Sequence, residues 1–326
     1  MRKFIIFSAA IFLAGIIISC QKESANEVLI FTSSEDFRIE HFQKRFDEQF
    51  PQYKVIINYT TTGNLAAKLK AEGTKTDCDI IGELDSAYLE GILDNLADLS
   101  SFDTSVFVDE LVPGHKKYLP LVKSAGCIGI NEKFLSDRHL PIPASYQDLI
   151  KPEYKGVISM PNPKSSGTGY FYLKNLVNVW GENAAFAYFD KFAENVLQFT
   201  SSGSGPVNAL IQGEVGIGLG LITSIVNAIN TRGIPLKAIF FEEGSPYSMY
   251  GMGIIKGKES KKAVREVFEF YAFTLNREDK ELFVPEQVFK NQVNNIPNYP
   301  KNIKAADMRG IEDLSEKERL LAKWKY

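Results

Sequence analysis

The chain is poor in the residues that build disulfide frameworks and metal centres. Among 326 residues there are only three cysteines and three histidines. These counts exclude a scaffold held by several disulfides and disfavour a histidine-rich metal site. Basic residues are not in excess, since 37 Lys and Arg face 40 Asp and Glu, so nucleic acid is not an expected partner. A hydrophobic content of 44% excludes disorder, and the length suggests about two domains.

The one long apolar run is at the N-terminus. Arg2 and Lys3 precede residues 4–18, which are almost purely apolar. A run of about 15 residues is short for a membrane span and typical of a signal peptide. It ends in Ile17-Ile18-Ser19-Cys20, which resembles a bacterial lipobox. We therefore expect a signal peptide at 1–19, lipidation of Cys20 and a lipidated tether at 20–27; the alternative is a plain secretory signal with an incidental cysteine.

A chain that starts at Cys20 carries a formal charge of −5, because Arg2 and Lys3 are removed. Two kinds of acyl chain on this cysteine would anchor the protein stably to a membrane. The expected location is the cell envelope, facing the periplasm or the exterior. Cys78 and Cys127 remain, each in an apolar strand-like run. We favour buried free thiols over a disulfide, which would need Cα atoms within about 7 Å.

Strands and helices alternate along the rest of the chain. Strand patterns at 28–32, 54–59 and 79–82 are separated by helical ones, which predicts a mostly parallel sheet covered by helices. Residues 118–131 contain two extended runs, as expected of strands that cross between domains. The expected fold is α/β, with two mostly parallel sheets joined by two hinge crossovers. Lobe 1 would comprise 28–122 plus 245–326, and lobe 2 would be inserted at 123–244.

Four turns rich in Ser, Thr and Gly precede predicted helices. Helix N-termini carry unpaired N–H groups and a partial positive charge, and hydroxyls add donors, so such turns can bind anions. A single turn of this kind is usually a plain helix cap. Four turns over both domains indicate one shared ligand. The candidate ligand-binding residues are Ser33, Ser34, Thr62, Gly63, Ser165, Ser166, Gly167, Thr168, Ser201, Ser202 and Ser204.

Several segments together resemble a known family. They are the lipobox, Thr62-Gly63-Asn64-Leu65, Asp77-Cys78-Asp79-Ile80, the run from Pro161 to Tyr170 with Ser-Gly-Thr-Gly-Tyr at its end, and Gly213-Glu214-Val215-Gly216. The chain resembles extracellular solute-binding lipoproteins of ABC transporters, in the type-2 periplasmic branch related to ferric-iron, hexose-phosphate and aminoalkylphosphonate binders. This resemblance implies two lobes that close on a ligand about a hinge. It also implies a monomer that delivers its ligand to an ABC permease and its ATPase, without a cofactor.

Departures from the family pattern narrow the expected ligand. Iron-binding relatives use an adjacent tyrosine pair near residues 219–224, where this chain has none, and ferric iron prefers hard anionic oxygen donors. Sugar-phosphate relatives use a His-Asp pair near the position of Ser201, which is followed here by Ser202. We therefore expect a small oxyanion such as a phosphonate or phosphate ester, with ferric iron as the alternative.

Acidic residues near the expected cleft could receive a ligand ammonium group, although most such acids are simply solvated or complement a helix dipole. They are Glu35, Asp36, Glu83, Asp85, Glu242 and Glu243. Together with the anion loops they make a zwitterion such as 2-aminoethylphosphonate an attractive hypothesis.

An enzyme, such as an envelope hydrolase, is less well supported. His41, His115 and His139 lack the spacing of metal ligands, and no Gly-x-Ser-x-Gly motif precedes a helix. The sequence therefore predicts no catalytic residue and no metal ligand.

Overall fold

The computed structural model describes residues 25–326. The expected signal peptide, Cys20 and the start of the tether lie outside this range. Glu27, expected in the tether, is the first residue of a strand. The strands are β1 (Glu27–Thr32), β2 (Lys54–Tyr59), β3 (Ile80–Asp85), β4 (Leu119–Asn131), β5 (Ile158–Pro161), β6 (Val196–Thr200), β7 (Ile217–Leu221), β8 (Leu236–Ile239) and β9 (Tyr247–Ile254).

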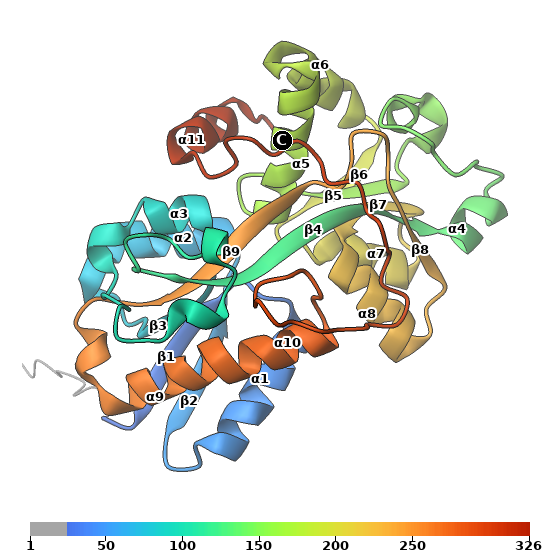
Figure 1. Ribbon diagram of the computed structural model, residues 1–326. Helices are drawn as coiled ribbons and strands as arrows, with labels where there is room; N and C mark the ends of the chain where they lie inside the picture. The colour runs from blue at the N-terminus through green and yellow to red at the C-terminus, as the bar shows by residue number, and fades with distance from the viewer. Residues whose placement is uncertain (1–24) are drawn as a thin grey trace, which may run out of the picture.

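Eleven α-helices are assigned within the described residues (Figure 1). They are α1 (Asp36–Gln49), α2 (Thr62–Glu72), α3 (Ser86–Glu90), α4 (Glu132–Asp137), α5 (Gly167–Trp180), α6 (Glu182–Phe192), α7 (Gly205–Gln212), α8 (Ile222–Arg232), α9 (Lys262–Phe270), α10 (Asn276–Leu282) and α11 (Leu314–Lys323). Short 3-10 turns lie at Gly73–Lys75, Leu93–Asn95, Thr104–Val106, Asp109–Leu111, Asp148–Ile150, Pro152–Tyr154 and Lys258–Ser260, and a π-turn at Tyr271–Leu275 joins α9 to α10.

Two strands connect the two halves of the molecule into one sheet with the order β2-β1-β3-β9-β4-β7-β5-β6, with β8 also paired to β4. The first part of β4 pairs with β9, and its second part, from Gly126, pairs with β7 and β8. Pairings among β1, β2 and β3, and among β5, β6 and β7, are parallel. Those of the crossing strands are antiparallel. The expected two parallel sheets are thus joined by β4 into one mixed sheet.

Each half has its own hydrophobic core. We call lobe 1 the half with β1–β3, α1–α3, α9 and α10, and lobe 2 the half with β5–β8 and α4–α8. In lobe 1 the aromatic face of α1 packs on the π-turn, where the Phe42 and Phe46 rings lie 5.2 and 5.5 Å from Tyr271. These phenylalanines are fully buried because they recur at helical spacing and face the sheet. The predicted two-lobed α/β fold is confirmed.

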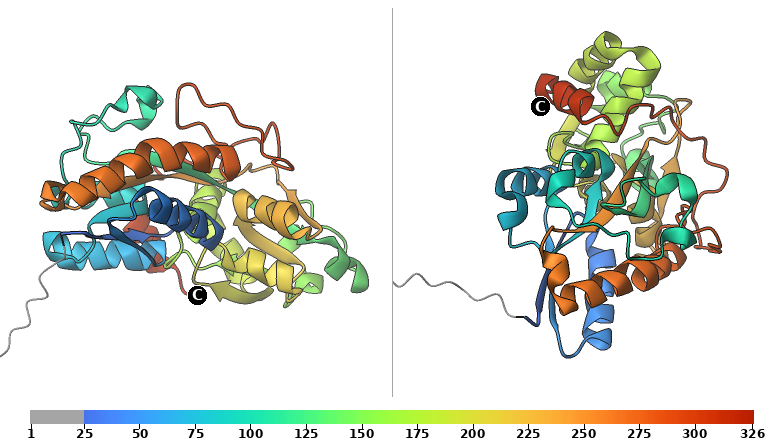
Figure 2. Two further views of the ribbon diagram at one scale, coloured as in Figure 1. Left: turned by 90° about the horizontal axis from the view of Figure 1, so that it is seen from below. Right: turned by 60° about the vertical axis from the view of Figure 1, so that its left-hand side comes forward.

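The C-terminal stretch packs partly against lobe 2. Residues 296–326 were expected in lobe 1, but Ile296 and Tyr299 pack with the core of lobe 2, and Trp324 lies 5.1 Å from Phe189. Helix α11 accordingly lies beside α5 and α6 (Figure 2). Helix α11 also contacts lobe 1, because Lys317 pairs with Asp85 at 2.7 Å, so the C-terminal stretch touches both lobes.

Cys78 and Cys127 are both buried and free, as expected. Burial raises the pKa of both thiols, which keeps them protonated and unreactive. Within residues 25–326 no helix has both the length and the apolar character needed to cross a membrane.

Candidate functional site

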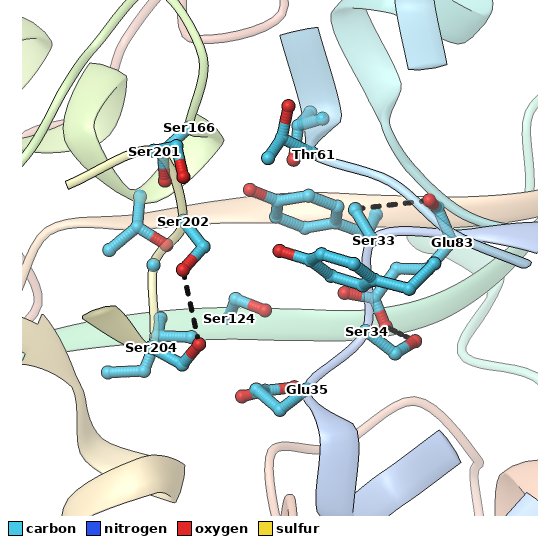
Figure 3. Close-up of a pocket in the computed structure, with 16 residues that line it drawn as sticks. Ser33, Ser34, Glu35, Thr61, Glu83, Ser124, Ser166, Ser201, Ser202 and Ser204 are labelled. Carbon is cyan, nitrogen blue, oxygen red and sulfur yellow. Dashed lines mark hydrogen bonds between the residues drawn. The ribbon is translucent and has the colours of Figure 1, made fainter. Parts of the chain in front are cut away.

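A cavity lies between the lobes where several strands end. It encloses about 420 Å³, counted out to the solvent at its mouth. Ser33 follows β1, Tyr59 ends β2, Ser166 follows β5, Ser201 follows β6 and Leu221 ends β7. Carboxyl ends of parallel strands in α/β folds are the usual place for ligands. Figure 3 shows the hydroxyls of both lobes facing each other across this space.

Four helix N-termini meet at this cavity, and their first residues are not ordinary caps. Glu35, Thr61, Ser166 and Ser204 precede α1, α2, α5 and α7, and none of these side chains accepts a cap hydrogen bond from a backbone N–H of its own helix. All four line the cavity. The Thr61 hydroxyl is buried and has no hydrogen-bond partner among the described residues. The Thr61 and Ser166 hydroxyls are therefore free to bind a ligand, and the helix dipoles favour an anionic group. Glu35 is instead bonded to Arg38 and Thr223, and the Ser204 hydroxyl lies 3.3 Å from that of Ser202.

Most of the candidate residues predicted from the sequence come together here. The cavity is lined by Ser33, Ser34, Thr62, Ser166, Thr168, Ser201, Ser202 and Ser204.

Three other candidates are close by but do not line the cavity: Gly63, Ser165 and Gly167. The Gly63 N–H donates to the Ser165 carbonyl at 3.0 Å and so joins the lobes. A Cβ on Gly63 would lie 2.4 Å from the Lys164 carbonyl oxygen, and one on Gly167 would lie 2.1 Å from the Tyr250 hydroxyl. Glycine at these positions therefore allows close approach of the lobes rather than direct ligand contact.

Thr61 and Gly203 also line the cavity and belong to the four turns, although they were not among the candidate residues. Nothing in the sequence indicated four other lining residues: Tyr59, Ser124, Leu221 and Tyr250. Ser124 and Tyr250 lie in the crossing strands β4 and β9, whose local sequence does not show which face meets the cleft. Thr61 could have been found, because it lies in one of the four hydroxyl-rich turns.

Of the six acidic residues considered, Glu35 and Glu83 line this cavity. Asp36, Asp85, Glu242 and Glu243 do not. Asp85 instead accepts hydrogen bonds from Ser248 and from buried Lys317, each at 2.7 Å.

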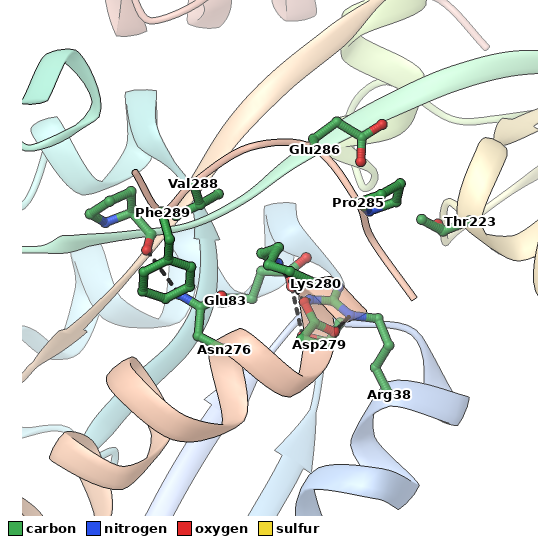
Figure 4. A network of polar contacts seen from close by, with 12 residues as sticks. Arg38, Glu83, Thr223, Asn276, Asp279, Lys280, Pro285, Glu286, Val288 and Phe289 are labelled. Atoms are coloured by element: carbon green, nitrogen blue, oxygen red, sulfur yellow. Dashed lines mark hydrogen bonds and ion pairs between the residues drawn. The ribbon is translucent and has the colours of Figure 1, made fainter. Parts of the chain in front are cut away.

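One buried arginine, Arg38, holds both cavity carboxylates. Figure 4 shows it beside Asp279 and Lys280. Nη1 of Arg38 donates to Oε2 of Glu35 and to Oε2 of Glu83, each at 2.8 Å. Its Nε and Nη2 donate to Asp279 at 2.7 and 2.9 Å, and Lys280 contacts the same carboxylate at 2.6 Å. Two cations thus face three carboxylates. The cluster therefore keeps one formal negative charge, and the described residues that line the cavity include no Lys or Arg.

The pKa values of this cluster move in opposite directions. Burial raises the pKa of Glu83, and this effect outweighs the attraction of Arg38. Burial would also raise the pKa of Asp279, but the charges of Arg38 and Lys280 prevail and lower it. Burial, with the nearby carboxylates, holds the pKa of Tyr250 well above its usual range, so its phenol stays protonated and can donate.

The structure limits what Ser34 can do for a ligand. Its hydroxyl donates to Oε2 of Glu83 at 2.8 Å and lies 2.8 Å from the Thr32 hydroxyl. With its proton used in this way, Ser34 offers lone pairs to the cavity while Glu83 is ionised. Ser34 is therefore not expected to donate a hydrogen bond to an anionic ligand. The hydroxyls of Thr61, Ser166 and Thr168 keep their protons available and can donate instead.

The donor set does not resemble a metal centre. Among residues 25–326 no three His, Cys, Asp or Glu side chains gather closely enough to hold a metal ion. Arg38 also bonds to both cavity carboxylates, and its positive charge opposes the binding of a trivalent cation.

The fold is that of solved periplasmic binding proteins. A model of the bacterial extracellular solute-binding protein family matches residues 79–274, and the chain belongs to this family. It is thus a solute-binding protein of the ABC-transport type and not an enzyme.

Three comparisons illustrate its relatives. A Haemophilus influenzae protein, described only as uncharacterized, is 26% identical over 293 residues, which cover 84% of this chain and 80% of that protein. The periplasmic binding protein AfuA from Actinobacillus pleuropneumoniae, solved with fructose-6-phosphate, superposes with a TM-score of 0.79 at 22% identity, over 91% of this chain and 97% of AfuA. Ferric ion-binding protein A of Pasteurella haemolytica gives 0.71 at 17% identity, over 91% and 96%. At these identities the two structures establish the fold alone.

Proposed function

We propose that this protein captures a small phosphorus oxyanion, a phosphonate or phosphate ester, in the interlobe cavity and delivers it to an ABC permease driven by an ATPase. The observation that carries this proposal is the meeting of four helix N-termini whose first side chains do not cap their own helices. Such a site binds an anion through backbone dipoles and hydroxyls, without a basic side chain. AfuA, which shares the fold, was solved with a sugar phosphate.

The negative character of the cavity favours a zwitterionic ligand. Glu35 and Glu83 line the cavity and share a single cation, Arg38, which bonds to both of them. A ligand with an ammonium group, such as 2-aminoethylphosphonate, would complement these carboxylates, while its phosphorus group meets the hydroxyl-rich helix starts. A plain dianion would bring like charges together inside a poorly hydrated space, which is costly.

Ferric iron is the second candidate because the cavity contains Tyr59 and Tyr250 besides two carboxylates. Ferric ion-binding protein A has the same fold. Ferric iron would bind these tyrosines as phenolates, and the raised pKa of Tyr250 opposes the ionisation of its phenol. This reading is therefore weaker.

The mechanism we propose is hinge closure, with lobe 1 at 28–122 plus 245–326 and lobe 2 inserted at 123–244. Two contacts join the lobes beside the cavity: Gly63 to Ser165, and the Thr223 hydroxyl to Oε1 of Glu35 at 2.8 Å. A ligand that touches both lobes stabilises the closed state through contacts that the open state lacks.

We also propose that the protein is a monomer in the cell envelope, anchored through lipidated Cys20. Metabolic labelling with a palmitate analogue should mark the wild type, and Cys20→Ser should lose both the label and membrane retention. An unlabelled, freely released wild type would favour the plain secretory signal.

The ligand is tested by thermal-shift and calorimetric titration of the purified protein with 2-aminoethylphosphonate, ethylphosphonate and ferric citrate. We expect stabilisation by a phosphorus compound, since a ligand that binds only the folded state raises the melting temperature. Thr168→Val should abolish the shift, because it removes a cavity hydroxyl at nearly constant volume. Thr74→Val, at an exposed turn outside the cavity, is the matched control. A shift with ferric salt alone would overturn the proposal.

A further inference from the structure

Helix α11 is attached to lobe 2 at both of its ends. In the segment before the helix, Ile311 is buried in the core of lobe 2, and the Asn178 side chain of α5 donates to the Asp307 carbonyl at 2.9 Å. Just after the helix, the Trp324 ring lies 5.1 Å from the ring of Phe189 in α6. The two ends of α11 are therefore fixed against α5 and α6.

The middle of α11 reaches lobe 1 instead. Nζ of Lys317 donates to Oδ1 of Asp85, at the end of β3, at 2.7 Å, and both residues are buried. On the surface, Lys70 of α2 pairs with Glu318 at 2.9 Å. Figure 1 shows α11 next to α3 as well as α5. The helix thus bridges the two lobes at the edge of the cleft.

The Lys317 ammonium group lies close to one aromatic ring from each lobe. Its Nζ is 4.1 Å from the ring centroid of Tyr88 in α3 and 4.7 Å from that of Tyr170 in α5. Contacts between a cation and an aromatic face gain strength when water is excluded, and Lys317 is only 1% exposed. Separation of the lobes would carry Tyr170 away from Tyr88 and Asp85. The ammonium group would then lose partners that compensate for its burial, which is costly.

We propose that α11 is a strap across the cleft, and that the contacts of Lys317 with both lobes stabilise the closed state. This inference rests on the proposed hinge closure but not on the identity of the ligand. A ligand that bridges the lobes binds the closed state, so the fraction of closed protein present before binding scales the apparent affinity. The strap therefore sets part of the ligand affinity without touching the ligand.

The test drives α11 away from lobe 1 with a wedge. Gly91, at the end of α3, is exposed and has a φ of −71°, which every residue type can adopt. A Cβ at this position would lie 2.4 Å from Cδ2 of Leu314 in α11. Gly91→Leu should therefore fold and displace the strap. Gly114→Leu is the matched control, because a Cβ there meets no atom within 4 Å.

The distance between the lobes is measured by double electron–electron resonance between nitroxide labels at Lys44→Cys in α1 and Asn208→Cys in α7, both exposed positions. Without ligand, Gly91→Leu should lengthen this distance relative to wild type and to Gly114→Leu. Circular dichroism checks that each variant is folded. An unchanged distance in folded Gly91→Leu would overturn the strap.

A charge reversal at the surface provides a second test that does not disturb the buried contacts. Glu318→Lys places like charges together at Lys70, and it should raise the ratio of open to closed protein by at most about 5-fold. Adding Lys70→Glu should restore the wild-type distance. No lengthening in either Glu318→Lys or Gly91→Leu, while a phosphorus compound shortens the wild-type distance, would overturn the strap and leave the proposed function standing. Lengthening in both variants with no response to any phosphorus compound would support the strap and refute the proposed ligand.

Discussion

Replacing Glu83 with glutamine changes the chemistry of the cavity wall while keeping its shape. Oε2 of Glu83 accepts hydrogen bonds from Arg38 and Ser34, both at 2.8 Å. The other carboxylate oxygen makes no hydrogen bond to the described residues, and Glu83 lines the cavity. In Glu83→Gln the amide oxygen can keep the bonds to Arg38 and Ser34. The amide nitrogen then replaces the second oxygen, so an acceptor becomes a donor.

The expected effect depends on the charge of the ligand. A hydrogen bond to a charged group contributes about 1.5–3 kcal/mol. Glu83→Gln should therefore weaken 2-aminoethylphosphonate about 10- to 100-fold. Ethylphosphonate has the same anionic head and no ammonium group. Its affinity should stay equal or rise, because a negative charge has been removed beside the anion.

Calorimetric titration of both compounds against wild type, Glu83→Gln and Glu242→Gln measures this difference. Glu242 is exposed and outside the cavity, so its variant controls for a change in net charge. An unchanged affinity for 2-aminoethylphosphonate in Glu83→Gln would refute the pairing of Glu83 with an ammonium group. Equal losses for both compounds would show that the substitution damages the site as a whole.

The same substitution makes a separate prediction about stability and pH. Because burial raises the folded-state pKa of Glu83 above its ordinary value of 4.5, its contribution to stability is full below that value. The contribution is lost as pH rises through the folded-state pKa. Glutamine does not titrate, so denaturant unfolding should show Glu83→Gln gaining stability relative to wild type as pH rises above about 4.5. A difference independent of pH would contradict the raised pKa.

Three further predictions concern packing. Lys317→Met should lower the free energy of unfolding, measured in urea, by about 3–5 kcal/mol, because it leaves Asp85 buried without its cation. Adding Asp85→Asn should recover part of the loss. A change below about 1 kcal/mol would mean that the pair is solvated. Gly63→Ala should weaken ligand binding with little change in the free energy of unfolding, because the added Cβ would lie 2.4 Å from the Lys164 carbonyl oxygen of lobe 2. Unchanged ligand affinity would show that closure does not need this close approach of the lobes. Cys78 and Cys127 should react with a thiol reagent only after denaturation, and rapid labelling of the native protein would contradict their burial.

A matched control for Gly63→Ala is Gly114→Ala, since a Cβ at Gly114 meets no atom within 4 Å. It should leave both affinity and stability unchanged. If both alanine variants weaken binding equally, the effect does not come from the approach of the lobes.

Much of the site was visible in local sequence because helix starts are local structures. The turns at Ser33, Thr62, Ser166 and Ser204 each combine small or hydroxyl residues with a following helical pattern, and each does begin a helix at the cavity. The fold class followed from the alternation of strand and helix patterns. The contact of Trp324 with Phe189 of lobe 2 could not be predicted in this way, because it forms only through tertiary packing.

The sequence by itself determined which turns could bind an anion, since capping chemistry and helix dipoles depend on neighbours along the chain. Only the tertiary structure decided how charge is arranged there. Arg38 meets Asp279 across 241 residues and Glu83 across 45. Those contacts bring two carboxylates into the lining and direct the proton of Ser34 to Glu83 rather than to a ligand. Burial and partners at long sequence separation set the charge and hydrogen-bond direction of a site, and no local pattern records them.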